Sequence, residues 1–194
     1  MSVEAAGAGY PLRFDVQYPE ALSRWKIFVK WLLAIPHFAV VYVLSLVAAV
    51  MTVIAFFSIL FTGKYPEGLF RFVVNVSRWN ANLMAYVGLM RDEYPPFSWD
   101  PGQYPVTYDV DYPPELKRWA PLYKWLLAVP HLIALLVVFI IAYIMWVVAF
   151  FAILFTGRFP KGPFDFIVGA LRWNYRVSAY TSLLRDEYPP FSTS

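Results

Sequence analysis

The chain has 194 residues, 60% of them hydrophobic and 15% charged, with a mean hydropathy of +0.52. Soluble domains are about 45–50% apolar and about 25% charged, so this composition excludes an ordinary soluble globular protein and predicts a membrane protein. The absence of cysteine excludes disulfides, thiolate metal sites and cysteine nucleophiles. The net charge is +3, but the 16 lysines and arginines flank apolar runs rather than forming a basic face. This distribution predicts anionic lipid headgroups, and no nucleic acid, as partners.

The chain repeats itself at an offset of 94 residues without a gap. Of the 91 aligned pairs from Tyr10/Tyr104 to Asp100/Ser194, 47 are identical, and the segment RDEYPPFS at 91–98 recurs unchanged at 185–192. Because no insertion separates the copies, each is expected to have the same fold. The predicted modules are residues 1–100 and 101–194, joined at a turn-like Asp-Pro-Gly tripeptide.

Each copy opens with a stretch in which aromatic and β-branched residues alternate with polar ones, at 12–18 and again at 106–112. A period of two residues is typical of a short β-strand. Such a strand is not stable alone, and its natural partner is the counterpart in the other copy. The alternative is an extended arm that lies on the membrane.

The next stretch, 22–35, interleaves basic residues with tryptophan, phenylalanine and leucine, as 116–129 does in the second copy. The basic residues of the first copy are Arg24, Lys26 and Lys30. Basic residues and tryptophans beside an apolar run are typical of an amphipathic helix anchored among lipid headgroups. Pro36 and Pro130 are expected to kink this helix or to turn it into the next one.

A long uncharged stretch follows in each copy, His37 to Phe61 and His131 to Phe155. A helix of this length extends roughly 37 Å, enough to cross a hydrocarbon core of ~30 Å with some tilt. Thr-Gly follows each stretch, and the glycine marks the expected end of the helix. Both stretches are therefore predicted to be transmembrane helices.

The fourth element, 68–90 and its copy 162–184, is mostly apolar but carries a polar stripe at spacings of three and four residues. The stripe contains Arg78 and Arg172, and an arginine at mid-bilayer costs ~2.5–3.5 kcal/mol. This helix either lies in the interface or crosses the membrane with its stripe against protein. Two crossings per copy place nine lysines and arginines on the side of the termini and four on the other, whereas one crossing leaves almost no bias. The positive-inside rule favours two crossings, with both termini cytoplasmic.

The expected architecture is an all-α membrane protein of two tandem modules related by a pseudo-two-fold axis along the membrane normal. Each module contains a short N-terminal strand or extended arm and an interfacial amphipathic helix. One long transmembrane helix follows, and then a second, polar-striped helix that is transmembrane or interfacial.

Four motifs recur in both copies: RW-x4-KWLLA-[IV]-PH from 24, ILFTG-[KR]-[YF]-P-x-G from 59, RWN from 78 and YPPFS from 94. The duplicated module that they define resembles the bacterial domain-of-unknown-function family 4389, and the resemblance covers nearly the whole chain. It implies an integral membrane protein of a bacterial cell. The expected location is the cytoplasmic (inner) membrane, with a multi-pass topology. The resemblance transfers no catalytic residue and no cofactor.

The RWN motif supplies six candidate residues for contact with lipid or with a partner: Arg78, Trp79, Asn80, Arg172, Trp173 and Asn174. The arginines are expected to bind lipid phosphate or an anionic substrate, or else to be buried at the seam between modules. Buried arginines are expected to be hydrogen-bonded by backbone carbonyls and by the two asparagines. RDEYPPFS is either a docking motif or a helix terminator whose aromatics rest on the module's own anchor helix.

His37 and His131 each follow a proline at the start of an apolar stretch. As a symmetric pair they are candidate ligands for a metal or a haem, or a proton site. The alternative is an interfacial histidine satisfied by water or by the backbone. Neither cysteine nor an HExxH motif accompanies them, so no metal and no cofactor is predicted.

The sequence has no P-loop, no glycine-rich dinucleotide turn, no GxSxG and no pair of intramembrane carboxylates, so the protein is not expected to be an enzyme. The expected role is that of an accessory or scaffold subunit of a membrane complex, or of a lipid-organising protein. Its expected partners are the bilayer and other membrane protein subunits or further copies of itself. The alternative is a small transporter or channel with a site for an anionic substrate or lipid at the repeat interface.

Overall fold

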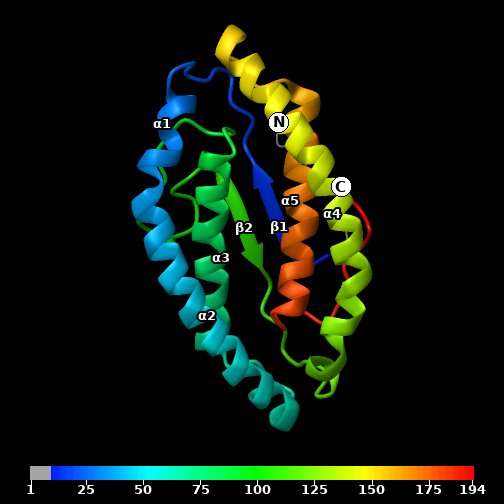
Figure 1. Cartoon of the computed structure of the whole chain (residues 1–194). Coiled ribbons are helices and arrows are strands. Elements are labelled where there is room, and N and C mark those ends of the chain that lie inside the picture. The colour runs from blue at the N-terminus through cyan, green and yellow to red at the C-terminus, as the bar shows by residue number, and fades with distance from the viewer. Residues whose placement is uncertain (1–9) are drawn as a thin grey trace.

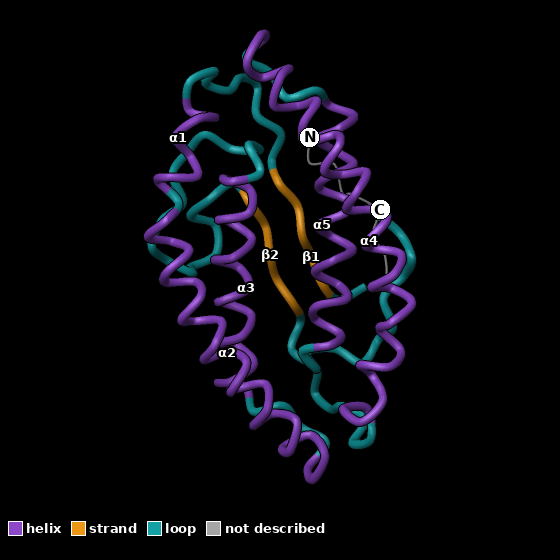
Figure 2. The backbone as a smooth tube through the Cα atoms, viewed as in Figure 1, coloured by secondary structure: helices purple, strands orange, loops and turns teal. Residues whose placement is uncertain are grey.

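The computed structural model describes residues 10–194, so the N-terminal residues 1–9, and the cytoplasmic location predicted for them, lie outside it. The described chain is mostly helical, with one short strand from each copy, and Figures 1 and 2 show its course. Its elements are β1 (Leu12–Val16), α1 (Lys26–Leu33), α2 (Ile35–Thr62), α3 (Glu67–Val87), β2 (Val106–Val110), α4 (Ala120–Thr156) and α5 (Lys161–Thr181).

The two copies treat their equivalent prolines differently. Pro36 lies in the first turn of α2, where its missing N–H costs no hydrogen bond. The helix is interrupted at Ala34, between α1 and α2. Pro130 lies inside α4, which continues through it as one helix. The anchor helix also begins later than expected, at Lys26, because the preceding residues reach across to the other copy.

The two strands pair with each other in antiparallel fashion, which was one of the two arrangements expected for these segments. Phe14 lies opposite Tyr108 at the centre, and Leu12 lies opposite Val110. Exchanging the copies leaves this register unchanged, so a pseudo-two-fold axis passes through the centre of the pair. One face of the sheet is buried, with Phe14 only 3% exposed, while Arg13 and Asp15 on the other face are exposed.

Each strand packs on a helix of the other copy. α3 contacts β2 and α5 contacts β1, while α2 packs along α3 and α4 along α5. In Figure 1, α2 and α4 form the two outer flanks, and the strands lie between the two helix pairs. The largest core cluster takes residues from every element of both copies. The ranges 1–100 and 101–194 therefore mark two sequence repeats that share one core.

The apolar helices α2 and α4 run in opposite directions. The end of α2 meets the segment before α4, where the N–H of Leu116 donates to the carbonyl of Gly63 at 2.8 Å, and Leu22 and Gly157 make the equivalent bond at 2.8 Å. Two crossings per copy, related by an axis along the membrane normal, would require α2 and α4 to run in the same direction. The two expectations, four crossings and an axis along the normal, are therefore wrong in combination. The offset match could not show this, because it says nothing about the relative direction of the copies.

Two helices, α2 and α4, are long and apolar enough to cross a membrane. Each contacts the rest of the protein along a narrow stripe, which on α2 consists of His37, Val41, Ala55 and Ile59. Most remaining side chains are apolar and exposed, for example Val50 at 58%. Four tryptophans of the anchor stretches extend this surface with exposures of 61–70%: Trp25, Trp31, Trp119 and Trp125. The exposed apolar side chains of α2 and α4, together with these four tryptophans, are called the apolar surface below.

Glycines at the ends of α2 and α4 hold the two copies together. Gly63 and Gly157 have φ of 74° and 71°, a left-handed conformation that ends each helix and that L-residues adopt at a cost. A Cβ on Gly157 would lie 3.3 Å from the Leu22 carbonyl, and one on Gly63 would lie 3.3 Å from the Leu116 carbonyl. Glycine thus permits both the turn and the close approach of the other copy.

We predict that Gly157→Ala lowers the free energy of unfolding by about 1–2 kcal/mol, because alanine is strained at this positive φ. Gly162→Ala is the matched control, since nothing lies within 4 Å of a Cβ there and the residue is in the first turn of α5. Chemical unfolding in detergent, followed by tryptophan fluorescence, measures both changes. Equal stability of the two variants would contradict the role given to Gly157.

Candidate functional site

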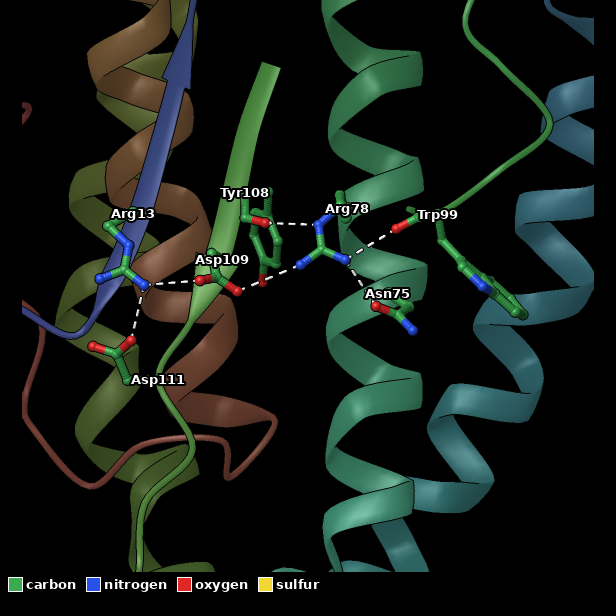
Figure 3. A network of polar contacts seen from close by, with 7 residues as sticks. All are labelled: Arg13, Asn75, Arg78, Trp99, Tyr108, Asp109 and Asp111. Carbon is green, nitrogen blue, oxygen red and sulfur yellow. Dashed lines mark hydrogen bonds and ion pairs between the residues drawn. The ribbon is translucent and has the colours of Figure 1, made fainter. Parts of the chain in front are cut away.

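Arg78 on α3 holds the central strand residue of the other copy (Figure 3). Its Nε donates to the Tyr108 carbonyl at 2.9 Å, and its Nη1 donates to the Trp99 carbonyl at 3.0 Å and to the Asn75 side chain at 2.8 Å. Its Nη2 lies 3.4 Å from a carboxylate oxygen of Asp109. The guanidinium is thus occupied on all three nitrogens, and the residue is only 8% exposed.

Arg172 repeats the arrangement on α5. Its Nε donates to the Phe14 carbonyl at 2.9 Å, its Nη1 to the Thr193 carbonyl at 3.2 Å, and its Nη2 to Asp15 at 3.1 Å. Phe14 and Tyr108 oppose each other in the strand pair. Each arginine therefore binds the copy to which it does not belong.

The carbonyls that the arginines bind point outward from the sheet. The N–H of Gln17 donates to the Pro105 carbonyl and the N–H of Asp111 to the Pro11 carbonyl, both at 3.0 Å. Hydrogen-bonded and non-hydrogen-bonded pairs alternate along an antiparallel ladder. Counting along the register puts Phe14 and Tyr108 in a non-hydrogen-bonded pair, whose carbonyls face the two edges. The arginines therefore satisfy edge groups that a two-stranded sheet leaves open.

The expectation that the arginines are buried at the seam and bound by backbone carbonyls agrees with this geometry, but the expected role of Asn80 and Asn174 is wrong. Neither asparagine is hydrogen-bonded to an arginine; Asn80 instead accepts a hydrogen bond from Tyr175 at 3.3 Å. Two residues along a helix correspond to a rotation of 200°, so Asn80 faces away from the strand that Arg78 binds. Asp15 and Asp109, which read in the sequence only as outward-facing strand residues, supply the acidic partners.

Lys30 and Lys124, expected to lie among headgroups, are buried at 1% and 2% exposure. Lys30 makes an ion pair with Asp92 at 2.9 Å and donates to the Arg91 carbonyl at 2.7 Å, and Lys124 pairs in the same way with Asp186. Burial lowers the pKa of Lys30, while the hydrogen bond to Asp92 acts in the opposite direction. These lysines fasten the segment after α3 and α5 to the anchor helix.

Most polar contacts of the repeated RDEYPPFS segment lie within its own copy, and two reach across: the Tyr104 hydroxyl donates to the Glu93 carbonyl at 2.8 Å and the Tyr10 hydroxyl to the Glu187 carbonyl at 3.3 Å. Arg91 makes a two-pronged ion pair with Glu93 and donates to the Gln17 carbonyl at 2.9 Å. Asp92 accepts a hydrogen bond from the Ser23 N–H at 2.6 Å, and Tyr94 donates to the Leu33 carbonyl at 3.0 Å. The second copy repeats these contacts. Tyr94 thus rests on the module's own anchor helix, whereas Phe97 stacks on His37 in the first turn of α2.

His37 and His131 are fully buried among aromatic rings. Nδ1 of His37 accepts a hydrogen bond from the Trp79 indole at 3.0 Å, and the imidazole stacks on Phe97 with ring centroids 4.0 Å apart. His131 has the same distances to Trp173 and nearly the same to Phe191. A nitrogen that accepts an N–H carries no proton, so the imidazole is neutral with its hydrogen on Nε2. This arrangement locks the ring in place.

The described residues, 10–194, contain no group of three or more His, Asp or Glu side chains arranged to hold a metal ion. The two histidines lie in separate modules, each with its own tryptophan. Each Nδ1 is bound by a tryptophan indole, and each Nε2 is buried without a hydrogen-bond partner among the described residues. Of the candidate residues, Trp79 and Trp173 hydrogen-bond the buried histidines. Asn80 and Asn174 lie together elsewhere in the interface between the copies, near Tyr175.

The fold and its interface define a tandem helical protein in which two copies share one core and exchange strands. A family model for a domain of unknown function (DUF4389) matches residues 24–98 and 118–193, one match for each copy and together more than half of the chain. The chain therefore belongs to the DUF4389 family, in which it has a two-copy arrangement. No curated protein and no solved structure matches the chain.

We predict that Arg78→Lys lowers the free energy of unfolding by about 2–3 kcal/mol, because an ammonium cannot donate along the fork that reaches two carbonyls and Asp109. Arg71→Lys is the control, since Arg71 is exposed and pairs only with Glu67 one turn away. The control should change stability by less than about 0.5 kcal/mol. Chemical unfolding in detergent measures both variants. Equal losses in the free energy of unfolding would show that Arg78 does not hold the strand of the other copy in place.

We further predict that Trp79→Phe lowers stability by about 1–3 kcal/mol, because it leaves Nδ1 of the buried His37 without a donor. Combining it with His37→Phe should recover most of the loss, since both polar groups are then removed. Trp99→Phe controls for lost indole volume, because that indole donates no hydrogen bond to any residue that the structure describes. Thermal melts in detergent measure all three, and a double variant less stable than Trp79→Phe would contradict the prediction.

Proposed function

We propose that the protein is a non-catalytic membrane protein that organises lipid or holds other membrane subunits, embedded through its apolar surface. The observation that carries the proposal is that exposed apolar side chains and exposed charged side chains lie on different faces of the protein. The apolar surface covers α1, α2 and α4 on the flanks, whereas the outer face of the sheet is charged. There Arg13 forms ion pairs with Asp109 and Asp111 at 2.8 and 2.9 Å. Exposed apolar areas of this size mark contact with membrane or protein.

The same separation suggests how the protein lies in the bilayer. If α2 and α4 crossed the membrane, their antiparallel arrangement would put the pseudo-two-fold axis at mid-membrane, and the charged outer face of the sheet with it. Charged groups exposed to lipid at that depth are costly. With the axis along the membrane normal instead, α2 and α4 lie within the membrane plane and the charged face lies in water. Exposed tryptophans beside Arg24, Lys26 and Arg118 suit the headgroup level.

A non-catalytic role is supported by the use of the polar side chains. The arginines that would bind an anionic substrate are occupied by backbone carbonyls and by Asp15 and Asp109. The remaining proposals from the sequence are kept: a bacterial inner membrane, anionic headgroups, and further membrane subunits or copies of this chain as partners. The outer face of the sheet, which carries both charge signs and faces water in this arrangement, is the proposed contact for such a subunit.

Cysteine labelling tests the arrangement, because the chain has no native cysteine. Single cysteines at Lys64, Pro101 and Arg158 are treated with a membrane-impermeant maleimide in intact and lysed spheroplasts. We expect all three positions to report the same side of the membrane. If Lys64 and Arg158 report opposite sides, α2 and α4 cross as an inverted pair. If these two agree and Pro101 differs, each copy crosses twice. Release of the protein from membranes by carbonate would contradict membrane embedding altogether.

A further inference from the structure

A cavity of about 340 Å³ opens at the interface of the copies, between α2, α3 and α5. It adjoins the buried face of the sheet, because Tyr175 in its lining packs against Phe14 and Tyr108 with ring centroids 4.8 and 5.2 Å apart. Its polar lining comes from hydroxyl and amide side chains, among them Ser45, Thr52, Ser77, Asn80, Asn174 and Ser178, and no charged residue lines it. Ligand pockets commonly have volumes of about 300–1,000 Å³, so the cavity is of a size to hold a small ligand group.

The lining of the cavity differs between the two copies. Moving it by the offset of 94 residues converts four of its six hydroxyl-bearing residues into large apolar ones, while Tyr175 and Ser182 correspond to Ala81 and Gly88. The four pairs are Ser45 with Phe139, Thr52 with Trp146, Ser77 with Leu171, and Ser178 with Met84. Two of the large residues, Phe139 and Trp146, pack against the shared core. The duplicated fold therefore accepts either a hydroxyl or a large apolar side chain at these four positions.

A further hydroxyl specific to the first copy lies beside this lining. Tyr65 corresponds to Phe159 in the second copy, is 1% exposed, and has no hydrogen-bond partner for its hydroxyl among the described residues. Burial raises the pKa of Tyr65 to about 12, and the neighbouring Thr52 side chain acts in the opposite direction. Tyr65 does not itself line the cavity, but its hydroxyl makes the region behind Thr52 more polar in the first copy than in the second, where Phe159 replaces it.

The mouth of the cavity opens within the apolar surface. Ser45 on α2 and Ser178 on α5 are exposed at its rim, and the neighbouring Leu46 on α2 is 53% exposed. Acyl chains that pack against this exposed side of α2 would thus have their polar end beside the hydroxyls of the cavity.

We propose that this cavity binds the uncharged, hydroxyl-bearing headgroup of a membrane lipid, with the acyl chains against α2; this rests on the membrane embedding proposed above. Hydroxyl and amide groups both donate and accept hydrogen bonds, which suits a glycerol or sugar group. A phosphate would need a cationic partner to offset its desolvation, and the lining has none. The location in the apolar surface selects a lipid rather than a free sugar.

The test uses the full chain in phosphatidylcholine nanodiscs that contain either dioleoyl monoglucosyl-diacylglycerol or dioleoyl phosphatidylglycerol. Native mass spectrometry should show one glucosyl lipid retained per chain, and excess free glucose should not displace it. The variant Thr52→Trp/Ser77→Leu, which takes its side chains from the second copy, should bind the lipid about tenfold more weakly, equal to about 1.4 kcal/mol. Val148→Trp places a tryptophan on the exposed side of α4, away from the cavity, and should retain the lipid. Thermal melts confirm that both variants are folded.

Each other outcome has a distinct meaning. Retention of phosphatidylglycerol, blocked by the same double variant, would overturn the uncharged headgroup. If the protein enters nanodiscs but retains neither lipid above phosphatidylcholine, or if the double variant retains the glucosyl lipid as well as wild type, the cavity is not a lipid site, while the proposed function stands. Failure to enter nanodiscs would overturn the proposed function and this inference together.

Discussion

The structure depends on two buried arginines that hold a sheet too small to be stable by itself. A two-stranded sheet of five residues per strand has little apolar contact of its own, and both of its edges are open. Arg78 and Arg172 bind one edge carbonyl each, from helices that belong to opposite copies. The strands in turn cover the polar stripes of α3 and α5. Neither the sheet nor the arginines would be tolerable without the other, because unpaired buried charge is among the most destabilising features of a fold.

Much of this architecture could be predicted from periodicity. The offset of 94 residues gave equivalent elements in both copies, alternation over 12–18 indicated a strand, and the uncharged runs indicated the two long helices. The Thr-Gly pairs also marked the ends of those helices at Gly63 and Gly157. Local patterns carry this information because helix length, strand alternation and capping are decided by neighbours in the chain.

The relative direction of the two copies and the partners of the buried charged side chains could not be predicted from the sequence, because both depend on contacts between residues far apart in the chain. Nothing local distinguishes Lys30, whose ammonium is buried against the Asp92 carboxylate, from Lys26, which is half-buried and reaches only the Asp92 carbonyl. The polar stripe on α3 correctly marked a face buried against protein, but its acceptors were carbonyls of a strand 30 residues away, and a carbonyl has no residue identity to recognise. Charge counting across loops assumed that each apolar helix crosses the membrane, and the antiparallel meeting of α2 with α4 removes the basis for that count.

The exchange of strands between the copies also bears on how such a protein arises. One copy alone would have an unpaired strand and an arginine without the strand carbonyl that it binds. The glycine carbonyl at the end of its long helix would also lack the N–H donor from the other copy. A second copy in the reverse orientation supplies all three partners. A single-copy chain would therefore fold as a homodimer with a true two-fold axis. Here the short connection through Asp100 replaces association from solution with an intramolecular encounter at high effective concentration. Fusion of the subunits also frees each from identity with the other, since a joined pair, unlike a homodimer, can carry serines on one side and aromatics on the other.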